Sequence, residues 1–576
     1  MTSHSPQPFP AQATPVLLRG HDDVVQLEGN AKRAIETGRT RLLVAGALFA
    51  VAYLVIAVRL TAVTLLSDGA EPRFAELPAQ SAPIERGEIV DRNGVVLATN
   101  LETWSLYANP QQIMDVDEAV ARLTDLLPDV NPITIHMKLT SGRSFEWLKR
   151  NLTPTQRYAV NRLGLPGLYF QQEDRRVYPQ GRLTAHVTGF TDIDNHGLAG
   201  IEQAFDDVLR EGHRQIALSL DIRIQNIVRE ETAQAIADFH AIGGAGMVMD
   251  IETGELLAMV SLPDFDPNSA GDAPDDARFN RNTLGVYEMG STFKLFNTAM
   301  ALDSGTIELT DSFDAVHPIR IGRFTIHDFH PEHRWLTVSE IIKYSSNLGS
   351  ARIAEKAGTA LQKDYMARFG MLKPVRLELP ELGLPLYPGD WKPINTLTIA
   401  YGHGIAVTPL HLIAGVAGLI DGGVYRPVTI MKRDGSVPFG GRRVIAEKTS
   451  GEIRQLMRLV VESGTGKSAN VPGYLVGGKT GTAEKQQGHH YIANARLASF
   501  IAAFPMNAPR YAILVMVDEP KPNASSHGYA TAGWVAAPAV GRVIQRMAPL
   551  LGIEPMPDEA PEAENVRLVP ASATTE

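Results

Sequence analysis

The sequence has 576 residues, a formal net charge of −10 and no cysteine. At roughly 150 residues per domain, this length corresponds to about three or four structural units. The mildly acidic balance contains no basic block, which argues against nucleic acid as a partner. Without cysteine, the chain can form no disulfide, no Cys-ligated metal site and no catalytic thiolate.

An apolar stretch near the N-terminus predicts a membrane anchor. Residues 42–66 are almost entirely apolar apart from Arg59, which is long enough for one helix to cross a bilayer. Basic residues cluster before this stretch, whereas the charged residues just beyond it are mostly acidic. Because positive charge favours the cytoplasmic side, we expect residues 1–41 to form a cytoplasmic tail and the chain after 67 to lie outside. One alternative is a cleaved signal peptide, but its basic segment would be shorter than the residues that precede this stretch. The other is a buried helix of a soluble domain, which would not explain the difference in charge between the two ends.

The first part of the outer chain predicts a small domain of strands and helices. Two strand-like stretches between residues 84 and 100 flank Asn93-Gly94, which is a strong hairpin signal. Residues 110–170 carry helical periodicity. The pattern changes around residue 218, so we expect an α+β domain over 67–225.

A larger domain is expected over residues 226–550. An amphipathic helix is followed by two apolar strands around the turn Glu252–Gly254, and two further apolar stretches late in the chain, at 497–505 and 511–520, are typical of buried strands. Apolar helical stretches lie between them. The sequence therefore predicts a mixed α/β fold with a mainly antiparallel sheet flanked by helices, and a Pro- and Glu-rich disordered tail over 551–576.

The chain contains one S-x-x-K motif, formed by Ser291 and Lys294. Gly290 precedes the serine and an apolar helical run follows, which places Ser291 at a helix N-terminus and Lys294 one turn further on the same face. A nucleophilic hydroxyl needs a base within hydrogen-bond reach, and the helix N-terminus offers N–H groups for a developing oxyanion. Taken alone, this motif is better explained by an N-cap serine beside a solvated lysine.

Two later motifs strengthen the interpretation of the first. Ser345 and Asn347 form an S-x-N motif, and Lys479 begins the run Lys479-Thr480-Gly481-Thr482. A second hydroxyl and an amide can relay a proton and hold a substrate amide. A strand carrying Lys and Thr around Gly481 can hold a carboxylate and admit a substrate backbone at its edge. The three motifs in this order predict one serine acyl-transfer site.

Two other segments imitate functional motifs. Lys448-Thr449-Ser450 resembles the third motif, but Glu452 follows Thr449 by three residues and an apolar helical run comes next, which predicts a capping box. The stretch His327–His333 contains three histidines, and its Pro and irregular spacing favour a loop, although the histidines could still converge on zinc.

The three motifs resemble those of the penicillin-recognising serine acyltransferases. The wider sequence resembles class B penicillin-binding proteins in four further segments, which are RGEIVDRNG (86–94), RRVYP (175–179), GLAGIE (197–202) and DIETGELLAMVSLPDFDPN (250–268). Within the class, SSNLG and VDEPK are more similar to the cell-division FtsI family than to the elongation enzymes. The departures are Met289, where a proline often stands, and Lys343-Tyr344 before the second motif.

The resemblance implies a membrane anchor, an elongated dimerisation-like pedestal over 67–225 and a penicillin-binding transpeptidase domain over 226–550. It implies septal peptidoglycan D,D-transpeptidation through a serine acyl-enzyme, with inhibition by β-lactams, and no metal or other cofactor. By this resemblance, Ser291 is the nucleophile and Lys294 is its base. Ser345, together with Lys479, transfers a proton to the leaving D-Ala. Asn347 orients the substrate amide, and Thr480 and Thr482, on either side of Gly481, bind the substrate carboxylate. The N–H groups of Ser291 and Thr482 would form the oxyanion hole.

The resemblance also implies a cellular setting. The substrates are peptidoglycan stem peptides, and the chain would sit in the bacterial inner membrane at the division septum as a single-pass protein with its catalytic domain in the periplasm. No polymerising domain lies between anchor and transpeptidase, so the division glycosyltransferase FtsW and other divisome proteins are the implied partners. An elongation-specific transpeptidase, or a β-lactam receptor or divisome scaffold without turnover, are the alternatives.

Overall fold

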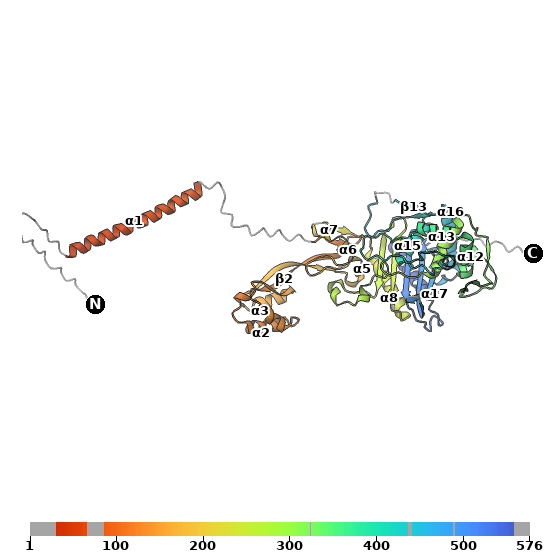
Figure 1. Ribbon diagram of the computed structural model, residues 1–576, viewed down its shortest axis with the longest axis horizontal. Helices are drawn as coiled ribbons and strands as arrows, with labels where there is room; N and C mark the ends of the chain where they lie inside the picture. Colours follow the sequence, from red (N-terminus) through yellow and green to blue (C-terminus); the bar gives the residue numbers. More distant parts are fainter. Residues whose placement is uncertain are drawn as a thin grey trace, which may run out of the picture. The chain divides into compact units, whose positions relative to one another are not determined.

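The computed structural model describes residues 30–65, 86–212, 214–322, 324–435, 440–487 and 490–557 (Figure 1). The chain divides into two compact units, Met1–Ala82 and Pro83–Glu576. Most of the predicted cytoplasmic tail, residues 1–29, and most of the predicted disordered tail, residues 558–576, lie outside the described residues.

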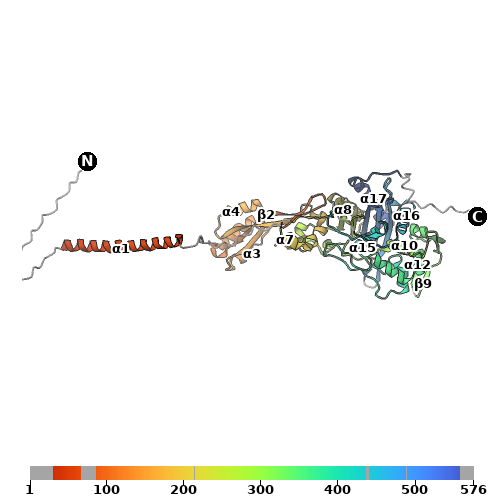
Figure 2. The same cartoon turned by 90° about the horizontal axis from the view of Figure 1, so that it is seen from above.

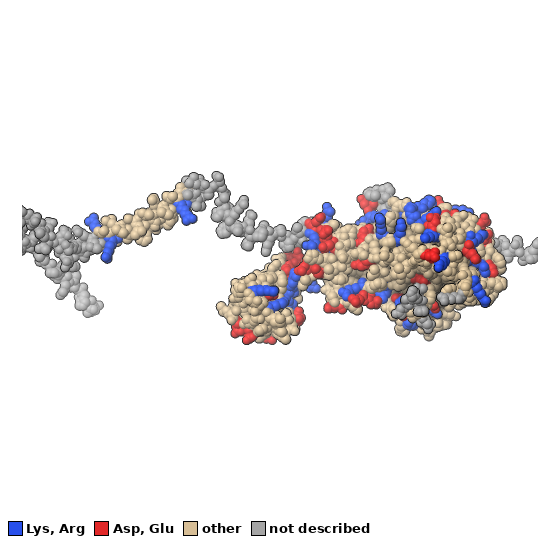
Figure 3. Space-filling view, in the orientation of Figure 1, with Lys and Arg blue, Asp and Glu red and all other residues tan. Residues whose placement is uncertain are grey.

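The first unit contains the helix α1 (Asn30–Leu65). Its segment Gly38–Thr61 is long and apolar enough to cross a membrane, and none of it is buried inside the protein. Figure 3 shows an uncharged body with basic side chains towards its two ends. Exposed apolar side chains along six turns need an apolar solvent, which agrees with the predicted single N-terminal anchor.

The second unit begins with a five-stranded sheet that we call, with its helices, the pedestal. The strand order is β3-β2-β1-β5, and β4 pairs with β2. The strands are β1 (Ile89–Val90), β2 (Val96–Ala108), β3 (Glu146–Leu152), β4 (Leu168–Val177) and β5 (Ile216–Ala217). The predicted hairpin at Asn93-Gly94 is confirmed: Gly94 has φ +85°, and the Asp91 carboxylate accepts hydrogen bonds from the N–H groups of Asn93 and Val95, both at 2.8 Å.

Three helices cover the long strand β2 at its far end. They are α2 (Val116–Leu126), α3 (Pro132–Leu139) and α4 (Pro154–Asn161). Leu106 of β2 is buried in one cluster with Leu123 of α2 and Ile135 of α3. The helical periodicity predicted over 110–170 is therefore correct for these helices, although β3 and β4 interrupt it.

A second five-stranded sheet forms the centre of the larger region that follows the pedestal. Its order is β14-β15-β16-β6-β7, and every neighbouring pair is antiparallel. The strands are β6 (Gly243–Asp250), β7 (Leu256–Leu262), β14 (Gly477–Gln487), β15 (His490–Phe504) and β16 (Tyr511–Asp518). All residues of β6, β7 and β16 are buried, as expected for strands covered on both faces, and the outer edge of β14 is unpaired in this sheet.

Helices cover both faces of this sheet (Figure 2). Because successive strand residues point to opposite faces, Met247 of β6 lies in one core cluster and Val248 in the other. One cluster is formed with α8 (Ile222–Asp238) and α17 (Ala532–Leu550). The other contains α10 (Phe293–Asp303), α15 (Pro409–Ile420) and α16 (Glu447–Ser463).

Shorter elements complete the second unit. The helices are α5 (Ala185–Thr188), α6 (Gly200–Ala204), α7 (Asp206–Arg210), α9 (Asp275–Arg278), α11 (Val338–Tyr344), α12 (Asn347–Ala357), α13 (Thr359–Arg368) and α14 (Pro393–Ile399). Two-stranded ribbons are formed by β8 (Ser312–Asp314) with β11 (Trp335–Thr337), β9 (Ile319–Ile321) with β10 (Phe324–Ile326), and β12 (Val424–Tyr425) with β13 (Arg442–Arg443).

The predicted boundaries at residue 225 and at Thr449 both lie inside helices. The division at residue 225 falls inside α8, and the Ser219 N–H donates to the Ile430 carbonyl at 2.8 Å, so we keep 67–225 and 226–550 as a proposed division of a closely joined unit. The predicted capping box at Thr449 is wrong. Helix α16 begins earlier, at Glu447, because the Asp303 carboxylate accepts hydrogen bonds from the Ala446 N–H at 2.6 Å and from the Thr449 hydroxyl at 3.2 Å.

Candidate active site

The S-x-x-K motif stands where a 3-10 turn, Gly290–Thr292, leads into α10. This places Ser291 at the helix N-terminus, as predicted. Lys294 lies one turn further, fully buried, with its Nζ 3.0 Å from the Ser291 Oγ. Gly290 has φ +54°, and a Cβ there would lie 2.7 Å from the Thr482 carbonyl oxygen, so only glycine allows the turn to pack this closely against β14.

The S-x-N motif lies at the break between α11 and α12. Ser345 ends α11 in the left-handed conformation, with φ 61°, and Ser346 caps α12 by accepting the Gly349 N–H at 3.0 Å. The break directs both motif side chains at Lys294, whose Nζ lies 3.2 Å from the Ser345 Oγ and 2.8 Å from the Asn347 Oδ1. A non-glycine residue held in this region of φ and ψ indicates that surrounding contacts fix its position.

The third motif lies on the edge strand β14. The Lys479 Nζ is 2.8 Å from the Ser345 Oγ, which joins the second and third motifs. A Cβ on Gly481 would lie 2.6 Å from the Met289 carbonyl oxygen. This glycine therefore permits the strand to approach the 3-10 turn that carries Ser291, which we call the nucleophile turn. The Thr482 Oγ1 accepts the Ala532 N–H of α17 at 3.2 Å, and the Thr480 hydroxyl pairs with that of Thr465 at 2.8 Å.

A cavity of about 500 Å³ opens over these groups. Ser291, Ser345, Asn347, Thr480 and Thr482 line it, while Lys294 and Lys479 lie fully buried beneath it. The structure therefore brings all eight predicted site residues together, from three segments that are distant in the sequence. The unpaired edge of β14 along this cavity can pair with an extended peptide, which would bring a substrate carbonyl to Ser291.

The surroundings of Lys294 favour its neutral form. Burial, reinforced by the nearby Lys479, holds the pKa of Lys294 well below its usual range, and the Asp328 carboxylate only partly opposes this. Two of its oxygen partners, the Ser345 carbonyl and the Asn347 Oδ1, can only accept hydrogen bonds. A neutral amine has two N–H groups for these acceptors, and its lone pair then accepts the Ser291 hydroxyl proton. This geometry is compatible with the predicted role of Lys294 as the base for Ser291, which stays a prediction.

The amide of Asn347 is oriented by contacts at both ends. Its Oδ1 accepts from Lys294, and its Nδ2 donates to the His327 carbonyl at 3.1 Å. Because only the nitrogen can donate to His327, the oxygen must face the lysine. In the free protein this side chain therefore orients the base, and its predicted contact with a substrate amide stays a prediction.

Asp328 is a site residue that the sequence analysis missed. It follows β10 in the loop that contains the three histidines, and it belongs to no recognisable sequence motif. One carboxylate oxygen accepts the N–H groups of Asn347, at 2.5 Å, and of Leu348, at 2.9 Å, and the other accepts the Ser346 hydroxyl at 2.7 Å. Asp328 thus satisfies the free N–H groups at the start of α12 and fixes the S-x-N motif.

Replacing Asp328 by Asn should slow β-lactam acylation roughly tenfold, because charge-assisted hydrogen bonds at the start of α12 are weakened. The lost negative charge also lowers the pKa of Lys294 further, so the acidic limb of the pH–rate profile should move to lower pH. Stopped-flow acylation kinetics measure both effects. Asp115→Asn, which changes the N-cap of α2 in the pedestal, is the matched control. An unchanged rate and profile for Asp328→Asn would show that Asp328 does not position the site.

Two further residues of the cavity also lacked a sequence signal. Thr465 precedes β14 and holds the Thr480 hydroxyl. His403 lines the cavity, and burial lowers its pKa to about 4, so it is neutral near pH 7. Its neighbour Gly402 packs against the nucleophile turn, since a Cβ there would lie 2.1 Å from the Gly290 carbonyl oxygen. Thr465 and His403 belong to none of the three motifs, so their place in the cavity follows only from the folded structure.

Lys479 is expected to determine an alkaline limb of acylation. Burial lowers its pKa to about 7, so its cationic form is present below pH 7 and is lost above it. If that cation donates to Ser345, the acylation rate should fall as the pH rises through about 7. In Lys479→Arg the guanidinium stays charged, so the residual rate should lose this limb while keeping the acidic one. Rates measured between about pH 6 and 9 test this, and an unchanged limb in the variant would assign it to another group.

Together, a serine with a buried lysine beside it and a second serine bridging to a second lysine define a serine acyltransferase site. Family comparisons agree. Residues 244–544 match the model of the penicillin binding protein transpeptidase domain, and residues 81–235 match that of the penicillin-binding protein dimerisation domain. The chain belongs to the penicillin-binding proteins and is a transpeptidase of this family, with a dimerisation domain before the catalytic one.

Individual relatives extend over most of the chain. It is 42% identical over 491 residues to the probable peptidoglycan D,D-transpeptidase FtsI of Caulobacter vibrioides, covering 83% of each chain. It is 30% identical over 519 residues to the peptidoglycan D,D-transpeptidase FtsI of Escherichia coli K12, covering 84% of this chain and 87% of the other. The crystal structure of penicillin binding protein 3 from Mycobacterium tuberculosis complexed with aztreonam is similar with a TM-score of 0.66 and 25% identity, over 82% of this chain and 98% of that one.

Proposed function

We propose that this chain is the peptidoglycan D,D-transpeptidase of the division septum and that Ser291 is its nucleophile. The observation that supports this most directly is the contact between the Ser291 Oγ and the Nζ of the fully buried Lys294, at 3.0 Å. Relatives named FtsI, with aligned regions covering most of both chains, support the substrate class and the division role.

In the acylation step, Lys294 accepts the Ser291 proton while the serine oxygen attacks the carbonyl of the penultimate D-Ala. The Ser291 and Thr482 N–H groups stabilise the oxyanion. Ser345, which accepts from Lys479 at 2.8 Å and lies 3.2 Å from Lys294, then passes its proton to the leaving D-Ala amine and takes up the proton held by Lys294, which becomes neutral again. The carboxylate of the donor peptide binds near Thr480 and Thr482, beside the N-terminus of α17.

In the second step, the amine of a neighbouring stem peptide attacks the acyl-enzyme. The attacking amine gives its proton through the Ser345 hydroxyl to Lys294, and Lys294 passes a proton to the Ser291 oxygen as the acyl–oxygen bond breaks, which restores the free serine and the neutral lysine. A β-lactam follows the first step and stops there, since its strained amide mimics the D-Ala-D-Ala bond and its leaving group remains attached. No step requires a metal ion or a cofactor.

The cellular part of the proposal places the N-terminus in the cytoplasm and the catalytic domain in the periplasm, with α1 as the anchor. Basic residues before the apolar segment, Arg39 and Arg41 among them, support this orientation. We further propose that a membrane glycosyltransferase such as FtsW and other divisome proteins are the partners, because the chain carries a dimerisation domain in place of a polymerising one.

Localisation tests the orientation and the septal role together. A fluorescent protein that matures outside the cytoplasm, fused after residue 576, is expected to form a midcell band in constricting cells. A variant fluorophore that matures only in the cytoplasm should stay dark at the same position. Depletion should block septation while side-wall growth continues. Rounded cells with normal septa would instead favour the elongation role, and fluorescence from the cytoplasmic reporter would contradict the orientation.

A further inference from the structure

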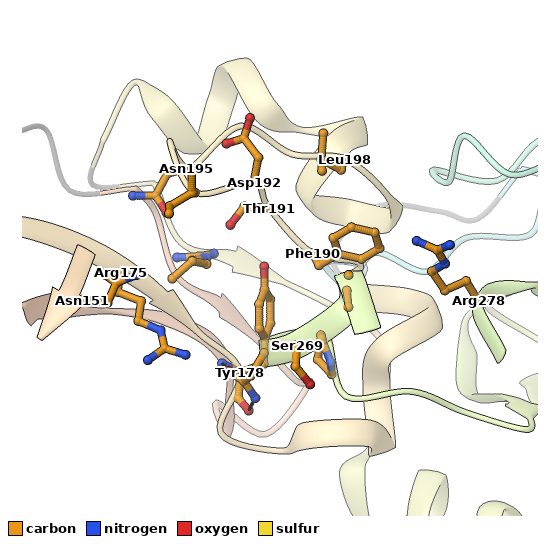
Figure 4. Close-up of a pocket in the computed structure, with 16 residues that line it drawn as sticks. Asn151, Arg175, Tyr178, Phe190, Thr191, Asp192, Asn195, Leu198, Ser269 and Arg278 are labelled. Carbon is orange, nitrogen blue, oxygen red and sulfur yellow. Dashed lines mark hydrogen bonds between the residues drawn. The ribbon is translucent and has the colours of Figure 1, made fainter. Parts of the chain in front are cut away.

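A second cavity, of about 440 Å³, lies between the pedestal and the transpeptidase region (Figure 4). We call it the pedestal cavity. It is lined by the end of β4 around Arg175–Tyr178, by the loop Phe190–Leu198, and by the 3-10 segment Pro267–Asp272 that follows β7. None of the three catalytic motifs contributes to its lining. Its volume falls within the usual range for small-molecule sites.

Two buried hydrogen-bond donors at this cavity lack an acceptor among the described residues. The Arg176 side chain is 1% exposed; its Nε donates to Glu202 at 2.6 Å and its Nη1 to Asn100 at 3.1 Å, but its Nη2 has no partner. The Tyr178 hydroxyl makes no hydrogen bond of ordinary geometry to a described residue, although Thr191 lies close enough to interact with it and Tyr178 is only 3% exposed. Figure 4 shows this hydroxyl pointing towards Thr191 across the cavity. Buried donors without acceptors are costly, and native proteins leave few of them.

The position of the Tyr178 ring is fixed from the transpeptidase side. The Tyr178 N–H donates to the Asn268 Oδ1 at 3.0 Å, and the Asn268 Nδ2 donates back to the Tyr178 carbonyl at 3.1 Å. This pair of bonds holds the backbone of Tyr178, so its hydroxyl is presented by a rigid frame. Both regions of the second unit therefore build the cavity, and a ligand there would contact both.

Among the described residues, the charges around the cavity leave one cation, Arg175, without an ion pair. Arg86 and Arg176 are balanced by Glu202 and Asp206, with Arg86 at 2.6 Å from both carboxylates. Arg278 pairs with Asp275 at 2.5 Å.

At the rim, the Asp192 carboxylate is engaged by the N–H groups of Asp194 and His196. Arg175 is exposed there, with no ion pair to the described residues. Two buried donors and one free guanidinium match a single carboxylate better than a doubly charged phosphate.

We propose that the pedestal cavity binds a carboxylate-bearing ligand whose oxygens accept hydrogen bonds from the Tyr178 hydroxyl and the Arg176 Nη2, with Arg175 at the rim. Two sources offer this group: the carboxylate of a peptidoglycan stem peptide and that of a free amino acid such as D-alanine. The site goes beyond the proposed transpeptidation because it is separate from Ser291 and performs no chemistry.

Titration calorimetry on the full-length protein in detergent tests the proposal. Penicillin first blocks the catalytic cleft, which the intact mass verifies. The probes are a disaccharide tetrapeptide with free carboxylates, the same compound with amidated carboxylates, and D-alanine. The variants are Tyr178→Phe and Arg175→Gln. Tyr474→Phe, which changes a buried tyrosine of the transpeptidase core, is the matched control.

The expected result is one binding event for the free carboxylate, weakened about tenfold or more by Tyr178→Phe and by Arg175→Gln and unchanged in Tyr474→Phe. Tyr178→Phe should change the melting temperature little, because the lost hydroxyl makes no hydrogen bond of ordinary geometry to the part of the chain that the structure describes. Binding of D-alanine alone would identify a free amino acid as the ligand. Equal binding of the amidated compound, no binding to the acylated protein, or wild-type affinity in Tyr178→Phe would overturn the proposal.

Failure of penicillin to change the protein mass would count against the proposed function instead. The same titrations on unmodified protein would then still test the cavity, since Tyr178 and Arg175 lie outside the catalytic cleft.

Discussion

Ser291→Ala is expected to abolish covalent labelling by a fluorescent penicillin while the protein stays folded and membrane-bound. The substitution removes the hydroxyl oxygen that lies 3.0 Å from the Lys294 Nζ at the N-terminus of α10. Gel fluorescence measures the labelling, and circular dichroism with the melting temperature checks the fold. Ser468→Ala, which removes a hydroxyl from the lining of the same cavity, should label normally. Labelling of Ser291→Ala at the wild-type rate would refute the assignment of the nucleophile.

Lys294→Ala should slow acylation by roughly 10² to 10⁴, the factor that a positioned general base contributes. Its loss also leaves the Ser345 carbonyl and the Asn347 Oδ1 without their donor, so the second motif should loosen too. Rates of β-lactam acylation measured in excess inhibitor give the effect. Lys467→Ala, at an exposed lysine of the same cavity, is the matched control and should react at nearly the wild-type rate. A near-normal rate in Lys294→Ala would move the base to another residue.

Features that depend on neighbouring residues could be predicted from the sequence. The hairpin at Asn93-Gly94 needs a turn residue with positive φ, and Gly94 has it. Ser291 and Lys294 face one another because three residues make about one helical turn. The apolar strands β6, β7 and β16 were recognisable because strands buried on both faces are continuously apolar.

Features that depend on distant residues could not be predicted in this way. Asp328 reaches the start of α12, and Asp303 reaches the start of α16, so in both cases a side chain from another element satisfies the helix end. The expected capping box at Thr449 failed for this reason. The left-handed conformation of Ser345 likewise depends on packing around Lys294 and Lys479. Contacts between residues far apart in the sequence cannot be inferred from local sequence patterns.

Peptide exchange tests the central claim most directly. The full-length protein is incubated with a stem pentapeptide analogue ending in D-Ala-D-Ala and an acceptor amine, and the products are followed by mass spectrometry. The account predicts release of one D-Ala and transfer of the shortened peptide to the amine, through an acyl-enzyme mapped to Ser291. Normal penicillin acylation of Ser291 without any exchange product, with the partner polymerase present, would contradict a transpeptidase and identify a β-lactam receptor.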